Sequence, residues 1–181
     1  MTTVTTLSEL TGDYVLDTAR TRIGFVARHT LSTKVRGRFD EFEGGVRLDG
    51  ADPSKSSARL TIRAGSVQTG NRRRDEYLSR TFLDAAAHPA LTFASTGVRR
   101  SGDDAFAVTG DLTVRGVTRP VTVGFVLAEA EDDPADGFRV RFEGGAPIDR
   151  EDWGVRGNAL TSAMVSPKVV LEFDVTVVRR P

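Results

Sequence analysis

Few side chains in this sequence are of the types that carry out acid–base or nucleophilic chemistry. The chain has two histidines, His29 and His88, and no cysteine. The lack of cysteine excludes a thiolate nucleophile and a thiolate metal site. The sequence also lacks the Gly-x-Ser-x-Gly elbow, the phosphate-binding glycine loop and the His-Glu-x-x-His helix. We therefore predict that the protein is not an enzyme.

Acidic residues gather in two places. Asp149, Glu151 and Asp152 lie beside the single tryptophan and could attract a cation, but their spacing matches no metal-binding loop. The run 131–133 falls in an acidic turn, where charged residues are normally solvated. We predict neither a metal nor a cofactor.

A basic cluster, Arg72 to Arg74, occupies the first turn of the helix predicted within the one segment with a helical pattern, 66–84. The first turn of a helix carries the positive end of the macrodipole, so each cation there is unfavourable by up to ~1 kcal/mol. Two explanations are open. The arginines point into water and pair with carboxylates such as Asp75 and Glu76, or they and the free helix amides face an anionic group such as a phosphate.

The helical segment has one apolar face. Tyr77, Leu78 and Phe82 fall at one-turn spacing. Residues 69–71, Thr-Gly-Asn, supply a turn and an N-cap. The pattern predicts a short helix near residues 71–80, which we interpret as a plug or lid on a β-barrel.

Almost every other segment alternates apolar and polar residues with a period of two, as half-buried strands do. A phase slip between Phe39 and Phe42 indicates a bulge. About eight strands joined by short turns predict an antiparallel sheet that either closes or splits into a sandwich. Closure removes the edge strands and leaves room inside for side chains or one small ligand.

The face predicted to point inward is apolar. It is either an ordinary packed core or the wall of a tunnel for an apolar ligand. Glycines within the strand-like runs, such as Gly37, Gly110 and Gly144, indicate bends or room for another group to approach. The predicted lining, with two residues of the helix, is Ile23, Phe25, Val35, Phe39, Leu60, Ile62, Leu78, Phe82, Phe93, Phe106, Val108, Leu112, Val123, Phe125, Val140, Leu171 and Phe173.

Charge and hydropathy limit the class of partner. Lys+Arg and Asp+Glu both number 25, and a net charge of zero argues against a general nucleic-acid binder. No signal-peptide pattern or membrane-spanning apolar run is present, so we expect a cytoplasmic protein. We predict a flexible N-terminal tail over 1–12, with one helical turn around Leu7 to Leu10, and a single barrel domain over 13–181.

Several motifs resemble those of the YceI-like family of lipocalin-like polyisoprenoid-binding barrels. They are Ser-Val-Gln-Thr-Gly-Asn at 66–71, Arg74-Asp75 with Leu78, Gly-Asp-Leu-Thr-Val-Arg-Gly-Val-Thr-Arg-Pro at 110–120, and Arg150 with Trp153 and Gly154. The resemblance covers about residues 13–178. The Leu-Thr-x-Arg-Gly-Val-Thr block and the Arg-Asp-x-x-Leu helix are specific in combination. Tyr77 stands where the family pattern has histidine.

The resemblance implies an all-β fold: an extended eight-stranded antiparallel lipocalin-like β-barrel with a short helix beside its opening. It also implies a lumen that carries a long-chain isoprenoid, a quinone-like molecule or a similar amphiphilic lipid, without catalysis. The expected partners are this lipid, a membrane in transient contact, and a second copy in a homodimer. The polar head of the lipid would lie at the mouth, where the candidate contacts are His29, Arg72, Arg74, Asp75 and Tyr77.

Two other functions fit the same residues. One is an enzyme that acts on a hydrophobic substrate inside the barrel through His29, Asp75 or Tyr77. The other is a stress-response or interaction module whose barrel is filled by its own side chains. A continuous cavity would separate the first two functions from the third.

Overall fold

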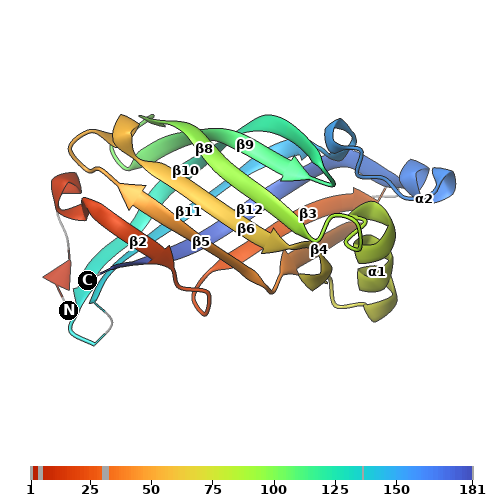
Figure 1. Ribbon diagram of the computed structural model, residues 1–181, viewed down its shortest axis with the longest axis horizontal. Helices are drawn as coiled ribbons and strands as arrows, with labels where there is room; N and C mark the ends of the chain where they lie inside the picture. Colours follow the sequence, from red (N-terminus) through yellow and green to blue (C-terminus); the bar gives the residue numbers. More distant parts are fainter. Residues whose placement is uncertain (1, 4–5, 30–32, 136, 181) are drawn as a thin grey trace.

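A computed structural model describes residues 2–3, 6–29, 33–135 and 137–180. The molecule is an elongated β-barrel with two short helices at one end (Figure 1). The helices are α1 (Arg72–Tyr77) and α2 (Ala159–Met164). The strands are β1 (Thr2–Thr3), β2 (Gly12–Leu16), β3 (Arg22–His29), β4 (Lys34–Phe39), β5 (Phe42–Leu48), β6 (Ser57–Arg63), β7 (Val67–Gln68), β8 (Ala90–Arg100), β9 (Ala105–Val114), β10 (Val117–Asp133), β11 (Gly137–Asp149) and β12 (Val165–Arg179).

Eight strands close the barrel through antiparallel pairing. The order around it is β10, β9, β8, β6, β5, β2, β12 and β11, and β11 pairs with β10 to complete the ring. Closure leaves no edge along the ring, so its backbone hydrogen bonds are satisfied between neighbours. The predicted all-β, eight-stranded antiparallel barrel is confirmed.

At some places around the ring, two shorter strands lie one after the other along the same neighbouring strand. The side of β12 that does not pair with β11 pairs with β3 through Val165–Asp174 and with β2 through Val177–Arg179. In the same way β5 pairs with β2, and β4 pairs with β3. Strand β4 ends at Phe39 and β5 begins at Phe42, so the chain changes strand where the sequence predicts a bulge.

The predicted helix begins where its cap places it. The side-chain Oδ1 of Asn71 accepts a hydrogen bond from the backbone N–H of Arg74 at 3.1 Å. After α1 the chain continues through a π-helical turn, Leu78–Phe82. The prediction of a short helix near 71–80 is confirmed, and its last turn is π-helical rather than α-helical.

The interior contains two groups of buried apolar side chains. The larger group includes Ile23, Leu112 and Trp153 and extends to Leu83, directly after the π-helical turn. The second group, which we call the end cluster, consists of Leu10, Tyr14, Ala130, Val140 and Val177. It lies toward the end of the barrel opposite α1 and α2 (Figure 1).

The helical turn predicted at Leu7 to Leu10 is confirmed as the 3-10 helix η1 (Leu7–Leu10). Leu10 is only 4% exposed, and the hydroxyl of Tyr14 donates a hydrogen bond to its carbonyl oxygen at 2.7 Å. Leu10 is therefore packed on the barrel, although the predicted tail over 1–12 includes it. Among the described residues, no helix is long and apolar enough to cross a bilayer.

Candidate functional site: a cavity along the barrel

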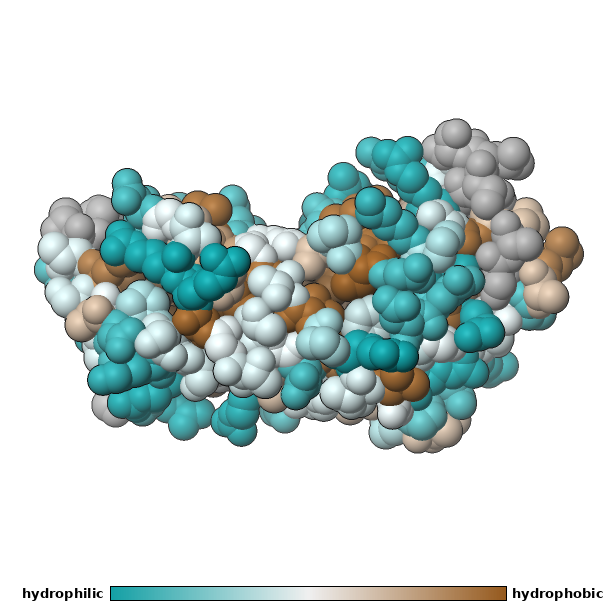
Figure 2. Space-filling view, turned by 90° about the horizontal axis from the view of Figure 1, so that it is seen from above, coloured by the Kyte–Doolittle hydropathy of each residue, from teal (hydrophilic) through white to brown (hydrophobic). Residues whose placement is uncertain are grey.

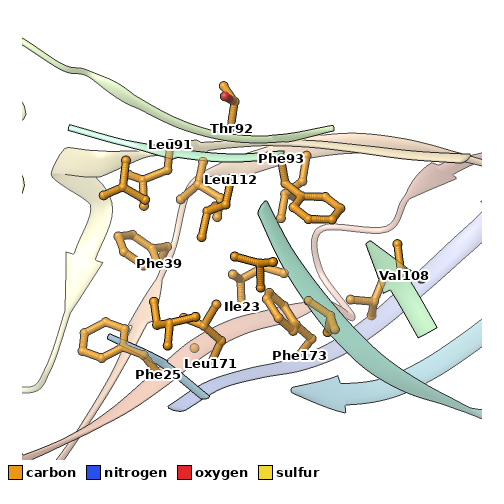
Figure 3. Close-up of a pocket in the computed structure, with 18 of the residues that line it drawn as sticks. Ile23, Phe25, Phe39, Leu91, Thr92, Phe93, Val108, Leu112, Leu171 and Phe173 are labelled. Atoms are coloured by element: carbon orange, nitrogen blue, oxygen red, sulfur yellow. The ribbon is translucent and has the colours of Figure 1, made fainter. Parts of the chain in front are cut away.

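The barrel encloses a cavity of about 520 Å³, within the range of small-molecule binding sites. Figure 3 shows its middle, where Leu91, Phe93 and Leu112 point toward Ile23 and Phe173 from the opposite wall. The side chain of Thr92, between Leu91 and Phe93 on β8, points the other way. The period-two pattern of the sequence thus separates the lining face from the outer face.

All the residues predicted to line the lumen do line this cavity, with one exception. The exception is Val140, which is fully buried in the end cluster, paired with Val177 on β12. Its side chain faces inward as predicted, but β11 runs past the end of the cavity. The prediction that Val140 lines the lumen is wrong because alternation gives the face of a strand and not the level along the barrel axis.

Glycines keep the aromatic rings against the wall. A Cβ atom on Gly37 would lie 2.2 Å from the ring of Phe25 on the neighbouring strand. A Cβ atom on Gly110 would lie 2.5 Å from the ring of Phe93. Each ring therefore lies over a glycine, in space that any other residue would fill. The group that approaches each glycine is thus an aromatic ring of the protein itself. Because the rings lie against the wall, the middle of the barrel stays open.

Polar side chains line the cavity at the end near α1 and α2. The hydroxyl of Tyr77 donates a hydrogen bond to Oγ1 of Thr161 at 3.3 Å and accepts one from the backbone N–H of Asn158 at 3.1 Å. These two bonds join α1 to α2. Arg28 is exposed and Met164 is 39% exposed, and both line the cavity, so it reaches the surface here. We call this end the mouth.

The YceI-like domain family model matches residues 14–177. The chain belongs to the YceI-like family. A UPF0312 protein of Azotobacter vinelandii is 34% identical over 150 residues, which cover 81% of this chain and 78% of that protein. A UPF0312 protein of Pseudomonas aeruginosa is 39% identical over 135 residues, covering 74% and 70% respectively. The family predicted from the motifs is confirmed.

Solved structures share the fold of this YceI-like chain. Burkholderia cenocepacia BcnA superposes with a TM-score of 0.80 at 26% identity, covering 89% of this chain and 98% of that one. A polyisoprenoid binding domain from Saccharophagus degradans, implicated in plant cell wall breakdown, gives 0.72 at 18% identity, with 92% and 98% coverage. The second likeness establishes the fold alone.

The candidate head-group residues of this YceI-like barrel separate into those at the cavity and those away from it. Arg74 and Tyr77 line the cavity. Arg72 has a 94% exposed side chain paired with Glu76 at 3.5 Å, so the first explanation of the arginine cluster holds for it. Arg72 does not line the cavity, because it lies on the solvent face of α1. His29 ends β3, and its side chain lies outside the described part of the chain.

Asp75 does not line the cavity either. Its carboxylate accepts hydrogen bonds from the backbone N–H and the hydroxyl of Thr69, at 2.8 and 2.5 Å. Thr69 also accepts from Arg74, at 2.7 Å on its hydroxyl and 2.9 Å on its carbonyl oxygen. Asp75 therefore fixes the start of α1, and a head-group role for it is not supported.

Arg150 is a lining residue that the sequence pattern did not predict. It is 4% exposed and donates hydrogen bonds to the carbonyl oxygens of Val155, Val165 and Ser166, at 2.7, 2.8 and 3.2 Å. Its guanidinium lies 5.6 Å from the ring centre of Phe82, and burial lowers its pKa. The family motif containing Arg150 and Trp153 is the one sequence signal that could have identified it.

The wall offers little for acid–base chemistry. Among the described residues, Asp49 is the only carboxylate in the lining, and its oxygen caps a turn by accepting from the N–H groups of Ala51 and Asp52. No group of three or more potential metal ligands occurs in the described ranges. The cavity argues against the alternative of a barrel filled by its own side chains. The site is suited to bind an apolar molecule.

Proposed function

We propose that this YceI-like barrel binds a long-chain isoprenoid or a similar amphiphile and acts as a carrier or buffer, without catalysis. The observation that carries the proposal is the apolar cavity of about 520 Å³, which runs from the mouth to the end cluster. The neighbour from Saccharophagus degradans, named as a polyisoprenoid binding domain, supports the same class of ligand. The tail would lie along the lumen and the head at the mouth.

The energetics favour reversible binding of the lipid over tight retention. Each buried methylene gains about 0.8 kcal/mol relative to water. The real competitor of the lumen is a bilayer, in which the tail is equally well shielded, so transfer between the two is close to neutral. The tail therefore sets the capacity of the lumen for lipid. Contacts with the head and the shape of the lumen determine which lipid is selected.

The head would meet a polar rim rather than a dedicated ion pair. The rim comprises Arg74, Tyr77 and Thr161, which combine a guanidinium group with two hydroxyls, and the buried Arg150 lies beside them in the lining. Guanidinium and hydroxyl groups donate to acceptor oxygens, such as those of a phosphate or a quinone. An oxygen-bearing head is therefore the expected chemistry.

Organic extraction of the purified protein, followed by mass spectrometry, tests the proposal. We expect one amphiphilic lipid per barrel, with a long apolar tail. A protein that yields no lipid and takes up no isoprenoid alcohol from a detergent solution would contradict it.

We also propose that the mouth touches a membrane when the ligand is exchanged. Leu160, on α2, is 73% exposed beside the mouth, and apolar atoms reach the surface at this end (Figure 2). We expect Leu160→Ser to slow transfer of a fluorescent isoprenoid from vesicles. Val126→Ser, which changes a 53% exposed residue on β10, is the matched control. Equal transfer rates in the wild type and Leu160→Ser would rule out this contact.

A further inference from the structure

The lining of the cavity extends beyond the part of the chain that matches the family. The match begins at residue 14, yet Leu7 and Leu10 of η1 both line the cavity. In Figure 1, η1 lies at the end of the barrel opposite α1 and α2. Residues outside the matched range therefore complete the wall at the end farthest from the mouth.

Side chains from other elements hold η1 in place. The hydroxyl of Tyr14 donates to the carbonyl of Leu10 at 2.7 Å, and Nη2 of Arg179 donates to the carbonyl of Glu9 at 2.5 Å. The guanidinium of Arg179 lies 4.0 Å from the ring centre of Phe138. Strand β1 also pairs with the end of β10. These contacts make η1 part of the barrel wall.

The turn at Gly50 lies directly against η1. A Cβ atom on Gly50 would lie 1.6 Å from the carbonyl oxygen of Leu7. The backbone N–H of Gly50 also donates to Oγ1 of Thr11 at 3.0 Å. Because Leu10 is 4% exposed and the turn leaves no room for a side chain, no tail can pass between η1 and this turn.

We propose that η1 is a stop that sets the longest tail the lumen accepts. The inference rests on the proposed function, with the head at the mouth and the tail pointing toward the end cluster. The stop is built from Leu7 and Leu10. It makes tail length, and not only tail polarity, a determinant of which isoprenoids this protein binds.

Enlarging the lumen at the stop is the direct test. The probes are all-trans isoprenoid alcohols of increasing length, from farnesol through geranylgeraniol to solanesol, with occupancy measured by native mass spectrometry. We expect wild-type binding to fall sharply beyond one length. In the double variant Leu7→Ala, Leu10→Ala, the first excluded alcohol should bind at least about tenfold more tightly, because each extra buried methylene gains about 0.8 kcal/mol and 1.4 kcal/mol is a factor of ten.

The matched control is Val140→Ala, which truncates a fully buried residue of the same end cluster without touching the cavity. It should leave the length limit unchanged. If Val140→Ala moves the limit as far as the double variant does, general loosening and not the stop determines tail length, and the proposal is wrong.

A second pair of variants leaves both leucines intact. Gly50→Ala should displace η1 by steric contact and also admit longer alcohols. Gly124→Ala adds the same methyl group where no atom lies within 4 Å and should change nothing. An unchanged limit in both the double variant and Gly50→Ala would overturn the stop. A wild type that binds no alcohol of any length would instead refute the proposed function.

Discussion

The two ends of the cavity differ in how they are built. At the mouth, α1 and α2 are helices of six residues, joined to each other by the hydroxyl of Tyr77. At the opposite end, Tyr14 is 2% exposed behind the lining, and Val140 and Val177 are fully buried. The short helices bring polar groups to the lining at the mouth, whereas the end cluster is apolar apart from the hydroxyl of Tyr14.

This difference gives the lumen a direction. An amphiphile placed with its head at the mouth keeps its oxygens near Arg74 and Tyr77, while the reverse orientation would place them beside the apolar side chains of Leu7 and Leu10. At the mouth, α1 and the α2 region are joined through the two hydrogen bonds of the Tyr77 hydroxyl, and we expect this end to open locally when they break. We therefore expect entry and exit at the mouth.

Blocking the lumen between the ends should have the largest effect. Leu60 lies on β6, opposite Phe93 on β8, and lines the cavity. Leu60→Trp adds volume where a tail must pass; displacing two to three methylenes at about 0.8 kcal/mol each corresponds to a loss of roughly ten- to fiftyfold in affinity. Titration with geranylgeraniol measures the loss.

The control for this variant is Thr61→Trp, whose side chain is exposed on the outer face of the same strand. It should bind geranylgeraniol as the wild type does. Comparable losses in the two variants would show that a new tryptophan disturbs the barrel generally, and the tail would then not need to lie in the lumen.

Loosening the mouth should have a smaller, kinetic effect. Tyr77→Phe keeps the ring that packs on Phe82, with centroids 5.6 Å apart, but removes both hydrogen bonds to the α2 region. Two hydrogen bonds at 0.5–1.5 kcal/mol each correspond to roughly tenfold faster exit of the ligand. Stopped-flow displacement of a fluorescent isoprenoid measures the rate. Tyr14→Phe, which removes a hydroxyl at the other end, should leave this rate unchanged, and equal acceleration by both variants would argue against exit at the mouth.

The sequence predicts the wall of the cavity better than its two ends. Ile23, Phe25 and Phe173 could be assigned to the lining because a strand in a closed sheet exposes every second residue to the interior. The helix could be placed because Asn71 caps it and its apolar residues recur at one-turn spacing. Both signals are local in the chain.

The ends depend on contacts between residues distant in sequence. Arg150 reaches carbonyl oxygens on β12, and Arg179 reaches η1 across nearly the whole chain. Leu7 and Leu10 precede the first alternating segment, so no period marks them as part of the lumen. The error at Val140 has the same origin, since the length of cavity that a strand spans is set by its partners and not by its own pattern.

The smallest expected effect lies at the closed end and concerns stability. Tyr14→Phe removes the hydroxyl that donates to Leu10 at 2.7 Å and should lower the free energy of unfolding by about 1–2 kcal/mol near neutral pH. Burial raises the pKa of Tyr14 above its ordinary value of 10.0, although the nearby Arg179 opposes the shift. The folded state therefore favours the neutral phenol. The stability that Tyr14 contributes should be complete below pH 10 and should decline as the pH rises through the raised pKa, because the unfolded chain ionises first.

Urea unfolding of the wild type and Tyr14→Phe at a series of pH values measures this contribution. The difference in free energy of unfolding between the two proteins should be constant from neutral pH up to about pH 9. It should become smaller above pH 10, where only the wild type loses stability through the Tyr14 hydroxyl. Tyr77 faces the mouth, so Tyr77→Phe should not reproduce the narrowing. A difference that stays constant into the alkaline range would contradict this prediction, because burial would then not outweigh the opposing effect of Arg179 on the pKa of Tyr14.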